Sequence, residues 1–196
     1  MSDPLIDAED DTATPLTPEE RAALIPTYIT LRPELNEVEQ IGIDEANLWA
    51  FSRKRDVLNE DFLKQLHKHM FGKVWRWAGE FRTTPRNIGI DAWNIAPELR
   101  ILLDNVRYWI ENNTYSPDEI AVRFHHKLVF IHPFPNGNGR HARLAADILV
   151  TQLDQPRLTW GSSNLVTVNE LRKSYVTALQ SADRENIGPL LVFARS

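Results

Sequence analysis

Residues 131–143 read Ile131-His132-Pro133-Phe134-Pro135-Asn136-Gly137-Asn138-Gly139-Arg140-His141-Ala142-Arg143, and this stretch decides how the chain folds. An apolar run ends at His132, and two prolines and two glycines follow it. Because proline and glycine interrupt regular structure, the pattern predicts one helix, a tight loop and a second helix.

The second half of this stretch has the features of an anion-binding site. Glycines just before a helix let backbone N–H groups approach an anion, and the helix N-terminus carries partial positive charge. Arg140 and Arg143 are three residues apart, so we expect both to grip phosphate oxygens from one helix face. His132 lies at the other end of the loop, where its ring could accept a proton as a general base.

Other interpretations of these residues are weaker. His132 could simply be a helix C-terminal residue favoured by the dipole, but the phosphate site five residues later favours catalysis. A transition-metal site at His125, His126 and His132 is disfavoured, because only two of them share a helix face and no third ligand is evident.

Composition excludes several classes of protein. The 196 residues contain no cysteine, so disulfides, thiolate metal sites and cysteine nucleophiles are excluded. The sequence lacks a long apolar run and a secretory signal, so we expect a soluble cytoplasmic protein with no membrane segment. Five of the 27 acidic residues lie within the first 14 positions, which leaves a body balanced against 22 basic residues. Binding to nucleic acid, as in an all-α DNA-binding regulator, is therefore disfavoured.

The apolar periodicity predicts an all-α protein with one small β element. We expect a mobile acidic tail at 1–16, an N-terminal helical extension at 17–58 and a core domain at 59–196. Proline-started capping boxes open helices at Thr17 and Ser116, and Gly72 stops the helix that begins near Asn59. Further helices are expected from Pro33, from Pro97, after the loop and at the C-terminus. Residues 83–90 favour a hairpin.

The stretch 132–143 resembles the signature of the Fic (Fido) family, H-x-F-x-[D/E]-G-N-G-R-x-x-R, with Asn136 at the position of the acid. The segments Glu34-Leu35-Asn36-Glu37 and Phe51-Ser52-Arg53-Lys54-Arg55 resemble the subgroup called mobile mystery protein B. The resemblance implies a Fido-type helical core with a small β-hairpin flap.

Proteins of this family mostly transfer AMP from ATP to a serine, threonine or tyrosine hydroxyl of a target protein. The resemblance makes His132 the general base and Asn136 a weak position for Mg²⁺, or Mn²⁺, where the family has an acid. It assigns phosphate binding to Gly137, Asn138, Gly139, Arg140 and Arg143. Doc relatives, which phosphorylate instead, carry a lysine at the position of Gly139, so this glycine favours AMP transfer. The alternative is a catalytically weakened nucleotide-binding module that acts through a partner protein.

The same resemblance implies a site for the target protein. Gly79-Glu80-Phe81-Arg82 resembles the family's stretch before the flap, whose backbone aligns a target segment by adding a strand. The flap residues here are Thr83, Thr84, Pro85, Arg86, Asn87, Ile88, Gly89 and Ile90. A regulator or antitoxin is a further partner that the resemblance suggests.

Many Fic proteins are inhibited by a helix with the motif [S/T]-x-x-x-E-[G/N], whose glutamate pairs with the last arginine of the loop. Ser181-Ala182-Asp183-Arg184-Glu185-Asn186 matches this motif, with Ser181, Glu185 and Asn186 at its defined positions. Short patterns of this kind also arise by chance. Glu39 is a second candidate, which has the expected location upstream but lacks the flanking motif residues.

Overall fold

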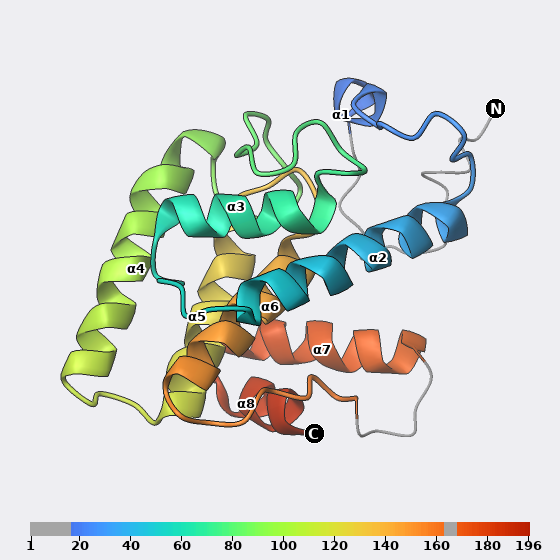
Figure 1. Cartoon of the computed structure of the whole chain (residues 1–196). Helices are drawn as coiled ribbons and strands as arrows, with labels where there is room; N and C mark the ends of the chain where they lie inside the picture. The colour runs from blue at the N-terminus through green and yellow to red at the C-terminus, as the bar shows by residue number, and fades with distance from the viewer. Residues whose placement is uncertain (1–16, 163–167) are drawn as a thin grey trace.

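The computed structural model describes residues 17–162 and 168–196, and helices make up most of them (Figure 1). The acidic tail at 1–16, for which we predict mobility, lies outside the described residues. The elements are α1 (Pro18–Ala22), α2 (Arg32–Phe51), α3 (Glu60–Phe71), the 3-10 turn η1 (Ala92–Asn94), α4 (Ile95–Glu111), α5 (Pro117–Ile131), α6 (Asn138–Gln152), α7 (Val168–Ala182) and α8 (Gly188–Arg195).

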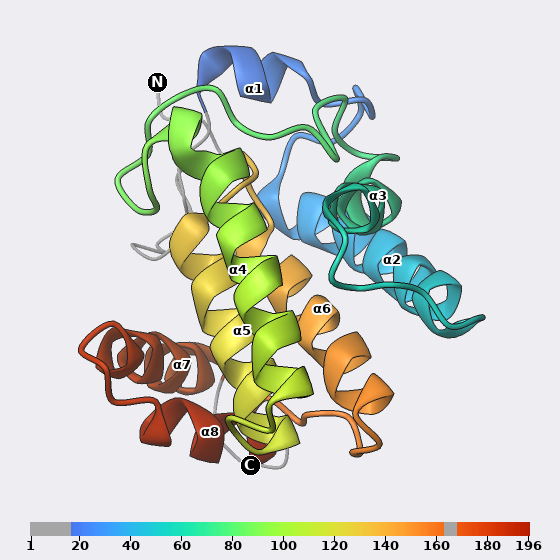
Figure 2. The same ribbon diagram turned by 90° about the vertical axis from the view of Figure 1, so that its left-hand side faces the viewer.

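Helices α5 and α6 form the centre of the molecule, and the loop 132–137 joins them. Helices α3 and α4 pack against this pair, with α2 covering α3, and α7 and α8 pack together on the other side (Figures 1 and 2). The predicted helix, loop and helix around residues 131–143 are therefore confirmed. Helices α2, α3, α4, α7 and α8 support this central pair directly or through one neighbour.

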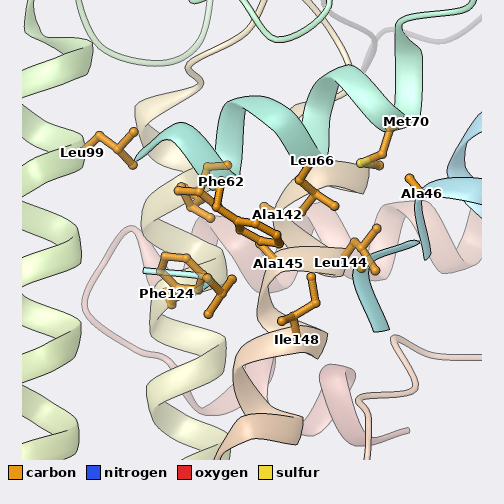
Figure 3. Packing of buried hydrophobic residues seen from close by; sticks show 14 of the residues in the cluster. Ala46, Phe62, Leu66, Met70, Leu99, Phe124, Ala142, Leu144, Ala145 and Ile148 are labelled. Carbon is orange, nitrogen blue, oxygen red and sulfur yellow. The ribbon is translucent and has the colours of Figure 1, made fainter. Parts of the chain in front are cut away.

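Two groups of apolar side chains hold the central pair. On one side, Phe62 and Leu66 of α3 lie over Ala142 and Ala145 of α6, as Figure 3 shows. On the other side, small residues of α5 and α6 face α7 and α8, where Phe193 is buried. Because apolar burial contributes roughly 25 cal/mol per Å², these two groups are the main source of the fold's stability.

The N-terminal extension shares a hydrophobic core with the segment that follows it. Leu35 and Ala46 of α2 are buried among residues of α3 and α6. Gly42 marks the crossing of α2 over α3, because a Cβ at this position would lie 2.3 Å from the carbonyl oxygen of Met70. A larger residue here would push α2, and the Glu39 that it carries, away from the loop.

The predicted capping box is confirmed at Thr17, and at Ser116 the structure has the side-chain cap of the helix. Thr17 accepts a hydrogen bond from the Glu20 N–H at 3.2 Å, and the Glu20 carboxylate accepts one from the Thr17 N–H at 2.9 Å. Ser116 caps α5 by accepting from the Glu119 N–H at 3.3 Å. The cap fixes where α5 begins, and its length then sets the position of His132 at its other end.

The predicted β-hairpin at 83–90 is wrong, because these residues form an irregular loop without strands. Pro85 has no N–H to donate to a ladder, and the carbonyls of Thr84 and Ile90 accept instead from the guanidinium of Arg82. Within the described residues, β pairing is limited to one bridge between Leu24 and Trp75. We keep the name flap for residues 83–90.

Within residues 17–162 and 168–196, none of the helices is both long enough and apolar enough to span a lipid bilayer.

Candidate active site

His132 ends helix α5 in a left-handed conformation, with φ 54° and ψ 59°. Its N–H still donates to the Leu128 carbonyl at 3.1 Å, while its own carbonyl turns the chain into the loop. The residue is 6% exposed, and this burial lowers the pKa of His132 to about 4. The charges of Arg82 and Arg86 lower this pKa as well, against a backbone hydrogen bond at Val129 that raises it. The ring is therefore neutral near pH 7, as a general base must be.

Asn138 holds the loop in shape through its side chain. Its Oδ1 accepts from the Phe134 N–H at 2.9 Å, and its Nδ2 donates to the Phe134 carbonyl at 2.8 Å. The side chain is thus engaged within the loop, and Phe134 is fully buried beneath it. Phe134 thus anchors the loop in the core, and any phosphate contact of Asn138 falls to its backbone N–H at the first turn of α6.

Gly137 adopts φ 77° immediately before α6 and leaves no room for a side chain. A Cβ there would lie 2.6 Å from the ring of Phe71. Gly139, one residue into the helix, has the Tyr175 hydroxyl 3.5 Å from a Cβ position. The first N–H groups of α6 have no acceptor within the helix, so this turn presents donors and partial positive charge to an anion.

Two buried histidines that the sequence analysis did not identify as site residues, His67 and His141, pack against Phe134 of the loop. The Gly79 N–H donates to Nδ1 of His67 at 3.0 Å, so Nε2 carries the proton and donates to the Asn136 carbonyl at 3.0 Å. The ring of His67 stacks on Phe134 with centroids 3.7 Å apart. Burial lowers the pKa of His67 well below 6.5 and that of His141 to about 4. The position of His67 on the apolar face of α3, beside Leu63 and Leu66, could have identified it.

Asn136 offers poor ligands for a divalent cation. Its Oδ1 accepts from the Gly137 N–H at 2.6 Å, and its carbonyl accepts from His67. Among the described residues, no three side chains of histidine, aspartate or glutamate gather in a group that could hold a metal ion. The residues present therefore do not fit a metal held by the protein, since Mg²⁺ prefers charged carboxylate oxygens.

The two arginines at the start of α6 face different neighbours. Nη2 of Arg140 lies 2.8 Å from Oε2 of Glu39, an ion pair without the angles of a hydrogen bond, and its guanidinium lies 5.0 Å from the ring centroid of Phe71. The guanidinium of Arg143 lies 5.4 Å from the ring centroid of Tyr175 on α7. The two guanidinium groups therefore point to different neighbours in this structure, and their joint grip on phosphate stays a prediction.

Glu39 is the glutamate that reaches the loop. It is 2% exposed, and its Oε1 accepts from the indole N–H of Trp75 at 2.7 Å. Its ion pair is made with Arg140 and not with Arg143, the arginine that the resemblance implied. The carboxylate thus pairs with one of the two arginines for which we predict phosphate binding.

The other inhibitory candidate lies in the turn between α7 and α8. Glu185 and Asn186 are exposed, and Oδ1 of Asn186 accepts from the Gly188 N–H at 3.3 Å. Within the part of the chain that the structure describes, Glu185 makes no ion pair with Arg143. Ser181 uses its carbonyl to accept from Arg184 and Asn186, which closes the turn after α7.

The histidines 125, 126 and 132 do not converge on one point. Nε2 of His125 bonds to the Tyr175 hydroxyl at 3.0 Å, and Nε2 of His126 pairs with Asp183 at 2.8 Å. Burial lowers the pKa of His125 to about 3.

The flap lies directly against His132. Gly89 has φ 89°, and a Cβ there would lie 2.5 Å from Cβ of His132. Glu20 of α1 holds the outer side of the flap, where it forms a close ion pair with Arg86 and accepts from the Thr84 hydroxyl at 3.3 Å. The flap and the base are thus in contact before any ligand arrives.

Comparison with known proteins places this site in a family. Residues 57–150 match the Fic/DOC family. The chain is 30% identical over 174 residues to protein adenylyltransferase fic-1 of Caenorhabditis elegans, an alignment that covers 83% of this chain and 31% of that protein. It is 32% identical over 171 residues to the fic-1 protein of Caenorhabditis briggsae, covering 83% of this chain and again 31% of the relative. The chain thus spans about a third of the length of these curated relatives.

Among solved structures, the BepC protein of Bartonella tribocorum, crystallised with bound AMPPNP, superposes with a TM-score of 0.68. The two sequences are 20% identical, and the match covers 91% of this chain and 97% of that one. A likeness at this identity shows the shared fold, and it agrees with the predicted all-α Fido core. Residues 57–150, which contain His132, Arg140 and Arg143, therefore belong to the Fic/DOC family.

Proposed function

We propose that this chain is a protein adenylyltransferase that transfers AMP from ATP to a hydroxyl group of a target protein. The observation that carries this proposal is the position of a neutral, buried His132 at one lip of the loop whose other end opens α6 beside Arg140. The curated relatives named above are adenylyltransferases, and their names support the same activity for this chain.

In this reaction a serine, threonine or tyrosine hydroxyl gives its proton to the ring of His132. Its oxygen forms a bond to the α-phosphorus of ATP while the bond from that phosphorus to the bridging oxygen breaks, so pyrophosphate leaves. The donors at the start of α6 and the guanidinium of Arg140 bind the phosphate oxygens and stabilise the negative charge that develops. Positioning and charge therefore supply most of the rate enhancement.

Magnesium enters this proposal as part of the nucleotide substrate. Asn136 adds a neutral oxygen at most, so ATP brings the cation with its own phosphate oxygens. Asn136 also favours a second candidate, the nucleotide-binding module with weakened catalysis that acts through a partner. In both cases Glu39 restrains Arg140, and a regulator that moves α2 would release it.

The flap residues Thr83 to Ile90 are the proposed contact for the target. Asn87, Ile88 and Gly89 are exposed, and Gly89 touches His132, so a target segment lying along them would bring its hydroxyl to the base. Their backbone is open to pairing with an extended segment, although no hairpin is formed beforehand.

Labelling tests the activity. The protein is incubated with α-³²P-labelled ATP, Mg²⁺ or Mn²⁺ and a cell lysate, and labelled protein is resolved by electrophoresis. We expect a labelled band that disappears in His132→Ala. Labelling that persists in this variant would remove His132 from the mechanism. ATP binding by calorimetry without any transfer would instead favour the weakened module.

A further inference from the structure

Arg82 is a buried arginine whose hydrogen bonds go to main-chain carbonyls. It is 3% exposed, and none of the described carboxylates lies within ion-pair distance of it. Its Nε donates to the His132 carbonyl at 2.6 Å, Nη1 donates to the Thr84 carbonyl at 3.0 Å, and Nη2 donates to the Ile90 carbonyl. A buried charge without an acid partner is expensive, so it calls for an explanation beyond packing.

Nη2 also donates to the Ile131 carbonyl at 3.4 Å, and these four carbonyls belong to two parts of the site. His132 contributes the base, and its carbonyl follows the left-handed residue that redirects the chain from α5 into the loop. Thr84 and Ile90 lie near the two ends of the flap, whose middle residues are exposed. A further contact joins the two parts, because the Arg82 N–H donates to the Pro133 carbonyl at 2.9 Å.

The planar guanidinium makes this junction rigid. Its N–H groups diverge at fixed angles, so one group sets the separation between the flap ends and the His132 backbone. The contact of Gly89 with His132 shows that this separation is small, and Nη2 of Arg82 lies 3.0 Å from the Cβ position of Gly89. A lysine ammonium could reach one or two of these carbonyls, but it has no planar fork with which to hold the angle between them.

We propose that Arg82 is a positioning residue that fixes the base His132 relative to the flap that aligns the target. This inference rests on the proposed function. Arg82 acts through the backbone of its neighbours and touches neither ATP nor the target hydroxyl. The competing role is purely structural: Arg82 would then stabilise the fold, and its loss would weaken ATP binding, transfer and folding together.

The first experiment compares Arg82→Ala and Arg82→Lys with the wild type. The rate of label transfer to the lysate band is measured beside the affinity for a fluorescent ATP analogue. We expect transfer to fall about 100-fold in Arg82→Ala and about tenfold in Arg82→Lys, because a misplacement of about 1 Å has an effect of this order. The affinity for the analogue should stay within about twofold, since the phosphate site lies at α6 and is intact.

Chemical rescue separates positioning from folding. Guanidinium ion at millimolar concentration should raise transfer by Arg82→Ala at least severalfold, because it can refill the space and restore the fork of donors. Arg76→Ala is the matched control, since Arg76 is an exposed arginine of the same connector. We expect its transfer to equal that of the wild type with or without guanidinium.

Three results would overturn the proposal: Arg82→Lys with wild-type transfer, Arg82→Ala that guanidinium does not rescue, or a parallel loss of analogue binding and transfer. If the wild type itself transfers no label, the proposed function fails instead. The positioning of His132 by Arg82 is then tested by NMR. Titration of the His132 ring should then show a higher pKa in Arg82→Ala than in the wild type and in Arg76→Ala, because a neighbouring positive charge is gone. An unchanged pKa of His132 in Arg82→Ala would reject the positioning role of Arg82.

Discussion

Replacing Glu39 by glutamine removes the negative charge that faces Arg140 and keeps an oxygen for the indole N–H of Trp75. The wild-type carboxylate makes both contacts, at 2.8 Å to Arg140 and 2.7 Å to Trp75. The two effects can therefore be separated, because glutamine preserves the volume and the buried hydrogen bond. We expect Glu39→Gln to bind ATP more tightly and to transfer label faster than the wild type.

The size of the gain follows from the ion pair. At 2.8 Å and an effective dielectric constant of about 20, the Coulomb attraction is about 6 kcal/mol. Desolvation of the buried carboxylate offsets much of it, so the net coupling to be released is on the order of 1–3 kcal/mol. This corresponds to an increase in ATP affinity of roughly 5- to 150-fold.

Calorimetry with the non-hydrolysable analogue AMPPNP measures this affinity, and the labelling assay measures transfer. Glu45→Gln on the same helix is the matched control, because Glu45 pairs with the exposed Lys73, whereas Arg140 pairs with Glu39. Exposed pairs contribute little, so we expect this control to behave as the wild type does. Equal affinity of Glu39→Gln and the wild type would refute the idea that Glu39 competes with phosphate for Arg140.

Three further predictions concern the loop, the flap and the buried histidines. Asn136→Asp should lower the Mg²⁺ concentration needed for half-maximal transfer about tenfold, because a carboxylate replaces a neutral oxygen; an unchanged Mg²⁺ titration would count against this account. Gly89→Ala should reduce transfer by about tenfold or more while analogue binding persists, since its Cβ would collide with His132 at 2.5 Å and its φ is 89°. Burial lowers the pKa values of these histidines below 6.5 in the folded state, so stability should be full above about pH 6.5 and should fall as the pH drops towards 4; a denaturation midpoint that stays constant from pH 7 to 5 would contradict this.

The helices and the loop could be predicted because local rules specify them. Thr17 and Ser116 cap helices with their own side chains, and the prolines and glycines between His132 and Gly139 force a break at one place. The conformation of the flap could not be predicted. Its β-biased sequence favours a hairpin, but the guanidinium of Arg82 takes the carbonyls that a ladder would need.

The contacts that connect distant parts of the chain could not be predicted from the sequence either. Glu39 and Arg140 are about a hundred positions apart in the sequence, and they meet because α2 packs over α3. The tautomer of His67 depends on the Gly79 N–H, and its role in holding Asn136 appears only when α3 lies beneath the loop. The short motif matches at Glu185 and not at Glu39, yet the fold leaves Glu185 exposed.

The most direct test of AMP transfer compares two labels in one assay. Parallel reactions with lysate receive ATP labelled at the α-phosphate or at the γ-phosphate, and the labelled proteins are compared. Because the proposed attack occurs at the α-phosphorus and releases pyrophosphate, we predict a band with the α-label alone, absent in His132→Ala. A band of equal strength from the γ-label would show phosphorylation and contradict adenylyl transfer by this chain.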